Sequence, residues 1–327
     1  MLPAAPPHVV DAAGQPALGR YSGMADSFDW SALAPPFRRS AWWRRFHHKR
    51  WHYVALGCEE VFCAVAIVDL GWTSTAFAYV FDRRERKLIA SFSRDGVPAL
   101  SASVAHHGAG ISRFRSPGVR IEIGSDGQRA YTLALSCAGI AIDASFAGGA
   151  PHLLATGVVA GGSVHATQKS PGMAVQGEVR IGARRVALDG AVASVDYSNG
   201  LLARDTDWRW ACAHNLDMGF NLQAGYFGAN ENALWLDGKI IALGAAQFDY
   251  NAADPMMPWH IYTDDGLLDV QFVPEGLRRE DKNLLIAASK YVQPIGTFSG
   301  WVKAHKDAAP IVVEALVGVT EEHHSVW

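Results

Sequence analysis

Short segments rich in β-branched and aromatic residues recur along most of this chain, and turns marked by Gly, Pro or Asp separate them. In residues 119–123 (VRIEI), apolar and polar side chains alternate strictly, which is typical of a strand with one buried face. Asp237-Gly238 is a two-residue hairpin signal. We therefore expect strands over most of residues 52–166 and 174–320, and an all-β protein.

Helices are expected to be few and short. Residues 37–48 contain no Pro or Gly and predict one short helix. Residues 276–290 are the only other candidate of any length, but Leu277, Leu284 and Leu285 do not form a clean apolar stripe.

Regularly spaced strands with few helices favour β-sandwiches or β-barrels. A closed barrel of about eight strands can hold one small ligand, and a chain of 327 residues suits two such units. Residues 167–177 (TQKSPGMAVQG) form the clearest boundary. We predict two lipocalin-like antiparallel β-barrels, with an N-terminal arm and the first barrel in residues 1–172 and the second barrel in residues 173–327.

The charge balance gives no reason to expect a nucleic-acid partner, because the formal net charge is only -3. Residues 37–50 (FRRSAWWRRFHHKR) are an exception, since they hold several Lys and Arg and no acid. Such a segment could contact a lipid surface or a nucleic acid, although a solvated face is the commoner explanation. We predict no nucleic-acid binding, leave peripheral membrane contact open and make no prediction of oligomeric state.

The sequence features that bear on location all favour a cytoplasmic protein. The four cysteines form no C-x-x-C motif and are expected to be reduced. The N-terminal residues show no secretory signal. The longest apolar stretch, residues 61–81, is interrupted by Asp69 and Gly71, so two strands fit it better than a membrane helix.

Motifs for nucleotide cofactors, metalloproteases and serine hydrolases are missing, because the chain has no G-x-G-x-x-G after a strand, no P-loop, no H-E-x-x-H and no G-x-S-x-G. Histidines are frequent, but the pairs at 47–48, 106–107 and 323–324 are adjacent in sequence. On a strand, adjacent side chains point to opposite faces and cannot chelate one ion together. We predict neither a cofactor nor a metal.

One stretch combines acids with indoles: residues 196–214 (DYSNGLLARDTDWRWACAH). If residues 207–214 are a strand, Trp208, Trp210 and Cys212 share one face. Two indoles close to Asp196 could form an apolar pocket with an ionisable wall. Packing in a core is the alternative explanation for the same pattern.

A carboxyl group pressed into apolar surroundings has its pKa raised by desolvation and can act as an acid near neutral pH. Nearby indoles could then stabilise a cation formed by protonating an alkene or enol. The carboxylates and histidines that could play such a part lie in or beside predicted strands; they are Asp196, Asp205, Asp207, His214, Glu231, His260, Glu321, Glu322 and His323. Of these, Asp196, His260, Glu321 and Glu322 have the most apolar or aromatic sequence context.

Residues 193–211 resemble the D-x-x-x-G…W-x-W block of a bacterial family catalogued as domain of unknown function 2804. Asn199 departs from the expected basic residue or His at its position, which puts in doubt a role for this residue in holding Asp196. Further blocks of the family agree in the same order over nearly the whole chain; they are residues 9–23, 49–53, 167–169, 231–239, 296–300 and 318–323.

More distantly, the chain is similar to two-barrel lipocalin-like proteins that include carotenoid hydratases and fungal cyclases and hydratases. That resemblance implies a ligand cavity in or between two barrels and an Asp that protonates a carbon–carbon double bond without a cofactor. It makes Asp196 the acid, with Glu321 or His323 as its partner. The residues then expected to bind the ligand are Trp208, Trp210, His214, Tyr197, Asn232, Trp259 and His260.

The predicted function is a cofactor-independent enzyme acting on a hydrophobic small molecule, as a hydratase, isomerase or cyclase. The alternative is a lipocalin-like binding or carrier protein for a lipid or terpenoid, without catalysis. A third hypothesis is an interaction role in which residues 38–50 dock a partner or a membrane surface.

Overall fold

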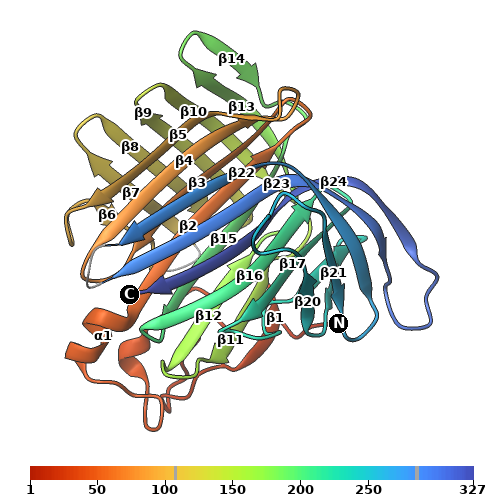
Figure 1. The fold of residues 1–327 in the computed structure, drawn as a ribbon. Coiled ribbons are helices and arrows are strands. Elements are labelled where there is room, and N and C mark those ends of the chain that lie inside the picture. The colour runs from red at the N-terminus through yellow and green to blue at the C-terminus, as the bar shows by residue number, and fades with distance from the viewer. Residues whose placement is uncertain (107–108, 284–286) are drawn as a thin grey trace.

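A computed structural model describes residues 1–106, 109–283 and 287–327. Within these residues the chain is almost entirely β and forms two curled antiparallel sheets, one a nearly closed barrel and the other a half-barrel (Figure 1). This architecture confirms the predicted fold class.

The first sheet consists of strands β1 to β15. In space they run β5-β4-β3-β2-β15-β13-β10-β9-β8-β7-β6, with β14 beside β13 and with β12, β11 and β1 branching from β15. The bounds are β1 (Gly19–Ser22), β2 (His48–Gly57), β3 (Val61–Asp69), β4 (Ser74–Asp82), β5 (Lys87–Gly96), β6 (Ala102–Ser103), β7 (Ala109–Ser116), β8 (Val119–Asp126), β9 (Ala130–Cys137), β10 (Ile140–Ala147), β11 (Leu153–Val158), β12 (Val164–Lys169), β13 (Met173–Ile181), β14 (Arg184–Ala187) and β15 (Val192–Leu201).

The second sheet takes the remaining strands in the order β19-β18-β17-β16-β24-β23-β22-β21-β20, and β20 curls back toward β17. The bounds are β16 (Asp205–His214), β17 (Met218–Gly225), β18 (Ala233–Leu236), β19 (Lys239–Ala242), β20 (Ala246–Asp249), β21 (Trp259–Thr263), β22 (Leu268–Asn283), β23 (Ala288–Val302) and β24 (Ile311–Val326).

The chain passes from the first sheet to the second at residues 202–204, between β15 and β16. The strands β13, β14 and β15 therefore pair within the first sheet, although they follow the boundary expected at 172/173. That boundary stays a prediction about domains, because sheet membership alone does not decide which segments fold independently.

Helix is confined to η1 (Trp30–Ala32) and α1 (Ala41–His47) in the described residues. The Ser40 hydroxyl caps α1 by accepting from the Trp43 N–H, which fits the helix expected at 37–48. None of these helices is long and apolar enough to cross a membrane.

The candidate helix at 276–290 is instead a pair of strand ends. β22 continues to Asn283 and β23 begins at Ala288, with the two strands paired along their whole length. Leu284 and Leu285 lie outside the described residues. Because this segment had no clean apolar stripe, pairing with β23 outweighed its weak helical preference.

Strands β2, β3 and β4 are buried on both faces, which explains their near-continuous apolar sequences. Val54, Val65 and Val80 point into the core of the first sheet. Alternate residues such as Tyr53 and Tyr79 point the other way, into a cluster shared with the second sheet. The region between the sheets is therefore built from the outer face of β2–β4 and the facing strands β16, β23 and β24.

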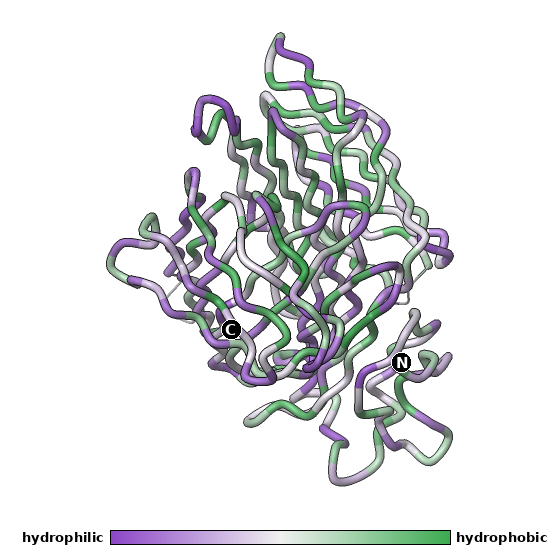
Figure 2. Tube along the Cα trace, turned by 90° about the vertical axis from the view of Figure 1, so that its right-hand side faces the viewer, coloured by the Kyte–Doolittle hydropathy of each residue, from purple (hydrophilic) through white to green (hydrophobic). Residues whose placement is uncertain are grey.

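Each sheet also has its own core. The N-terminal arm packs Phe28 and Trp30 into the first core, while Phe272 and Phe298 are central to the second. Figure 2 shows hydrophobic residues along the strands and hydrophilic residues gathered at several hairpin tips.

Candidate functional site

A cavity of about 190 Å³ lies between the two sheets, and aromatic side chains form most of its walls. β2 contributes Trp51 and Tyr53 to it, and β16 contributes Trp208 and Trp210. The Trp51 and Trp208 rings stack across the sheets at 6.5 Å between centroids. As predicted from their spacing, Trp208 and Trp210 share one face of a strand, and that face lines the cavity.

Asp196 reaches the same cavity from β15. It is paired in register with Lys169 on β12, and the Lys169 Nζ lies 2.6 Å from Asp196 Oδ2. The hydroxyls of Thr167 and Ser198 donate to the other carboxylate oxygen at 3.3 and 3.2 Å. This short ion pair joins β12 to β15 in the wall of the cavity.

Glu231, just before β18, is the second carboxylate on Lys169, with Oε1 3.3 Å from the ammonium. Asn221 on β17 donates to its carboxylate at 3.4 Å and accepts from the Trp210 indole N–H at 2.8 Å. Lys169 also lies over the Trp210 ring, 5.8 Å from its centroid. The Lys169 ammonium is thus enclosed by two acids and an indole in the wall of the cavity.

Burial acts differently on the two sides of this cluster. It raises the pKa of the Glu231 carboxyl above its usual value, and the Lys169 charge opposes that rise only in part. For Lys169, burial alone would lower the pKa, but the Asp196 and Glu231 carboxylates outweigh burial and raise it. The cluster therefore combines a firmly protonated amine with a carboxyl group that holds its proton unusually well.

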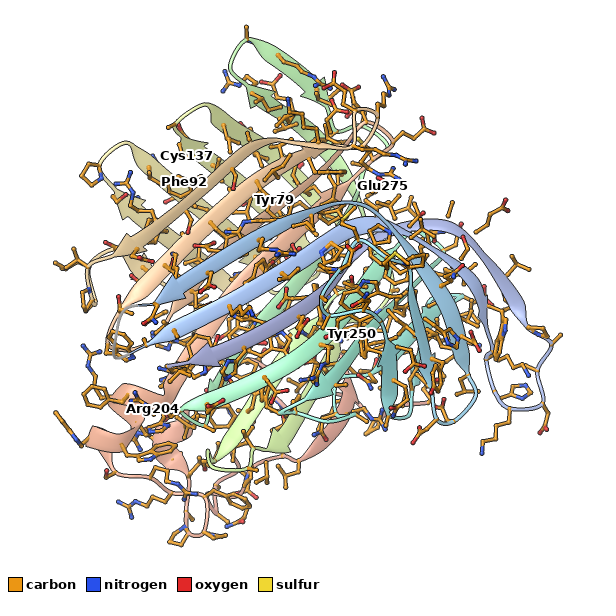
Figure 3. All side chains as sticks on the ribbon, viewed as in Figure 1. Tyr79, Phe92, Cys137, Arg204, Tyr250 and Glu275 are labelled. Atoms are coloured by element: carbon orange, nitrogen blue, oxygen red, sulfur yellow. The ribbon has the colours of Figure 1, made fainter. Side chains whose placement is uncertain are left out.

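Glu321 on β24 forms a second polar group in the cavity. The Trp208 indole donates to Oε1 at 2.8 Å, and the Gln293 amide donates to Oε2 at 3.0 Å. Gln293 accepts in turn from the Tyr79 hydroxyl on β4, so this chain of hydrogen bonds links the two sheets (Figure 3). His323, two residues on, packs against Trp208 at 4.2 Å and lies 3.6 Å from Glu321.

The structure thus brings five of the predicted site residues to one cavity: Asp196, Glu321, His323, Trp208 and Trp210.

The other predicted ligand-binding residues lie elsewhere. Tyr197 points into the first core, where its hydroxyl donates to the Ala105 carbonyl at 2.7 Å. Trp259 is buried in the second core and stacks on Tyr250 at 3.8 Å (Figure 3). His260, the next residue, points outward and pairs with Asp269 at 2.9 Å. These placements follow from strand alternation, because neighbours of a cavity-facing or core residue point away from it.

Asn232 and His214 also lie outside the lining of this cavity. The Asn232 side chain accepts from the Gln223 backbone N–H and donates to the Gly244 carbonyl, so it fixes a turn. His214 lines a separate hollow with Cys212, and burial lowers its pKa to about 3.

Sequence reasoning missed the residues that complete the site. Lys169 stood out only as part of the family block at residues 167–169, and Glu231 was one of nine candidate acids and histidines and began the block at 231–239, but had no assigned role. Gln223 and Arg278 had no signal, since each is an isolated polar residue in an ordinary strand. Arg278 lies over the Phe77 ring at 4.3 Å and pairs with Glu280. Their roles depend on strand pairing between residues far apart in sequence.

No group of three or more His, Cys, Asp or Glu in the described ranges is arranged to hold a metal ion.

The fold and this cavity define a class: two-sheet, lipocalin-like proteins with an aromatic pocket between the sheets. Within that class, the chain belongs to the family described as domain of unknown function DUF2804, which matches residues 4–327. No curated protein sequence matches the chain.

Solved structures share the fold at low sequence identity. A crystal structure of CghA with Sch210972 has a TM-score of 0.61 at 11% identity, covering 99% of this chain and 97% of that one. Kievitone hydratase from Nectria haematococca has a TM-score of 0.53 at 11% identity, covering 94% and 97%. A putative AttH from Nitrosomonas europaea has a TM-score of 0.53 at 12% identity, covering 91% and 98%. At these identities the likeness establishes the fold.

Proposed function

We propose that this protein is a cofactor-independent enzyme that acts on a hydrophobic small molecule by acid–base chemistry, as a hydratase, isomerase or cyclase. The observation that carries the proposal is the Lys169–Asp196–Glu231 cluster, buried in the wall of an aromatic cavity. A structural neighbour that is a hydratase by name adds support at the level of fold only.

In the proposed reaction Glu231 is the acid. Its raised pKa keeps it protonated at higher pH than an ordinary Glu, so it can give a proton to one carbon of a substrate double bond. The electron pair of that bond forms the new C–H bond and leaves a carbocation on the adjacent carbon. The indoles of Trp208 and Trp210 line the cavity, and the Trp208 indole, which carries no cation of the described residues over its ring, stabilises this positive charge.

Asp196 then acts as the base, which differs from the acid role that the family resemblance implied for it. Asp196 lines the cavity and contacts Lys169, so a proton that it accepts from the substrate can pass on to the rest of the cluster. In hydration Asp196 takes a proton from the water that adds to the cation. In isomerisation or cyclisation it takes a proton from a neighbouring carbon.

Lys169 closes the proton balance. After one turnover Glu231 lacks a proton and Asp196 carries one extra. Because the Lys169 ammonium contacts both carboxylates, it can pass a proton to Glu231 and regain one from Asp196. No external acid is needed between turnovers.

The test uses solvent deuterium. The compound that co-purifies with the protein is identified by mass spectrometry and incubated with the enzyme in D₂O, alongside geraniol, farnesol and geranylgeraniol. We expect deuterium at carbon in the product, and loss of incorporation in Asp196→Asn and Glu231→Gln. Asp269→Asn, in the exposed pair with His260 on the second sheet, is the matched control and should keep full activity. Full turnover by both single variants, each shown to be folded, would refute the roles assigned to Asp196 and Glu231.

A binding or carrier function is the second candidate, and one observation favours it. Within the cluster the charged groups satisfy one another, as they would in a purely structural ion cluster. A carrier would hold the co-purifying compound with no exchange of its carbon-bound hydrogens, and Asp196→Asn would leave its affinity nearly unchanged.

A further inference from the structure

Gln223 on β17 carries a buried amide that makes no hydrogen bond through its side chain. The residue is 3% exposed and lines the cavity between the sheets. Neither its Oε1 nor its Nε2 has a partner anywhere in the described part of the chain. Asn221, two residues earlier on the same face of the strand, is by contrast fully engaged with Trp210 and Glu231.

An unpaired amide at such a position is costly. A buried donor or acceptor without a partner loses its hydrogen bonds to water and gains none in return, so most buried polar side chains in proteins are paired. An amide offers two donor hydrogens and an accepting carbonyl in one plane. Gln223 therefore presents adjacent donor and acceptor groups to whatever occupies the cavity.

Two hydroxyls add to this polar spot. Tyr53 from β2 and Tyr291 from β23 also line the cavity. The Tyr53 hydroxyl lies near that of Tyr79 and the Tyr291 hydroxyl near the Glu321 carboxylate, but within the described residues neither makes a hydrogen bond of normal geometry. Burial raises the pKa of both phenols, so they remain uncharged donors. Gln223 is also the cross-strand partner of Trp210, which places its amide beside the indole that covers Lys169.

We infer that Gln223 anchors the ligand, and that the cavity takes a mainly apolar molecule bearing one uncharged group that both donates and accepts hydrogen bonds. A carboxamide, a lactam, an enol or a neutral carboxylic acid has this chemistry. Beside Gln223 a charged group is disfavoured, because the amide and the two phenols do not compensate the loss of its hydration and the nearby Lys169 charge is already paired with Asp196. This inference rests on the proposed function in that it names the ligand class of the same cavity.

Three probes with one ring system test the inference: 2-naphthamide, 2-acetylnaphthalene and 2-ethylnaphthalene. The amide offers hydrogen-bond donors and an acceptor, the ketone offers an acceptor only, and the ethyl compound offers neither. The three molecules have nearly the same shape. Isothermal titration calorimetry should show the amide binding about tenfold or more tighter than the ethyl compound, with the ketone between them. In Gln223→Met the three affinities should converge to within about threefold, since the anchoring hydrogen bonds are gone.

The melting temperature of the unliganded protein distinguishes a role of Gln223 in ligand binding from a role in stabilising the fold. Gln223→Met removes an unpaired polar group, so the melting temperature of the unliganded protein should stay constant or rise. Gln247→Met, at an exposed position on β20, is the control and should change neither the melting temperature nor the order of affinities. A lower melting temperature in Gln223→Met, together with an unchanged order of affinities, would show a structural role and overturn the inference.

Equal binding of the three probes by the wild-type protein, or no binding of any, would also overturn it. The measurement needs no turnover. If the three probes bind in the expected order of affinity but no deuterium is incorporated into any compound, the role of Gln223 is supported and the proposed catalysis is refuted. If deuterium is incorporated but the three probes bind equally, the proposed catalysis is supported and the role of Gln223 in ligand binding is refuted.

Discussion

Lys169 is the residue on which the polar site depends, because its ammonium is the only positive charge that contacts either Asp196 or Glu231 among the ion pairs of the described residues. A buried charge is tolerated when it is paired, and removing one partner leaves the others exposed to the full cost of desolvation. At this scale the site is the Lys169–Asp196 ion pair with the Glu231 carboxyl beside it, set in an apolar wall.

Lys169→Met should therefore lower the free energy of unfolding by about 3–5 kcal/mol, since it leaves the buried Asp196 carboxylate without its counter-charge and the Glu231 carboxyl without one of its polar partners. Urea denaturation followed by tryptophan fluorescence measures the change. Lys282→Met, which removes a more exposed lysine paired with Asp95 and Glu280, should cost less than about 1 kcal/mol. Equal costs for the two variants would contradict the role given to Lys169.

The raised pKa of Glu231 predicts a pH dependence of stability. The folded state holds this proton more tightly than the unfolded state, whose Glu titrates near 4.5. The contribution of the protonated form is complete below pH 4.5 and is lost as the pH rises through the folded-state pKa. The unfolding free energy of the wild type relative to Glu231→Gln should therefore decrease as the pH rises above about 4.5. A difference that is flat or increases with pH would show that Glu231 has no raised pKa.

At the scale of elements, β15 and β16 show how alternation divides neighbouring residues between two environments. Asp196 faces the cavity while Tyr197 faces the first core. In β16, Trp210 faces the cavity while Ala211 belongs to the second core. A strand in this fold thus serves a core with one face and the site with the other.

Helix α1 is the element that bears on membrane contact, which remains a prediction. Trp42 and Phe46 are 76% and 40% exposed and pack against each other at 4.9 Å, within the basic segment 37–50. Arg45 also reaches the Gly71 carbonyl, beside Leu70 and Trp72 at the rim of the cavity. Exposed aromatic and basic side chains together suit an anionic membrane surface.

If this helix binds membranes, the wild type should co-sediment with vesicles of phosphatidylcholine and phosphatidylglycerol. The double variant Trp42→Ala/Phe46→Ala should lose at least half of that binding while its melting temperature stays constant. Leu216→Ala removes an exposed apolar residue from another turn and should bind normally. Absence of wild-type binding at low salt would reject membrane contact through α1.

At the scale of the whole molecule, the site exists because two sheets are held face to face. Arg83 on the loop after β4 makes a two-point ion pair with Glu275 on β22, at 2.8 and 3.1 Å (Figure 3). Lys282 on β22 bonds Asp95 on β5 at 2.8 Å. These contacts, with the aromatic cluster between the sheets, fix the distance across which Asp196 and Glu321 share one cavity.

The sequence by itself determined the all-β class, most of the strands and the shared face of Trp208 and Trp210. Those features depend on alternation and turn residues within about ten positions, so they can be read locally. It also singled out Asp196 and Glu321 from their apolar neighbours, while His323 was proposed as a partner through the resemblance to hydratases and cyclases.

Only the tertiary structure decided which of those residues meet. Lys169 reaches Asp196 through the β12–β15 pairing, and Glu231 and Gln223 arrive from the second sheet. The same packing places Tyr197 in the core of the first sheet and Trp259 in the core of the second, and it leaves His260 on the surface. Strand pairing joins residues far apart in the chain, and the choice of face follows from which sheet covers it. Neither is encoded in the local pattern around one residue.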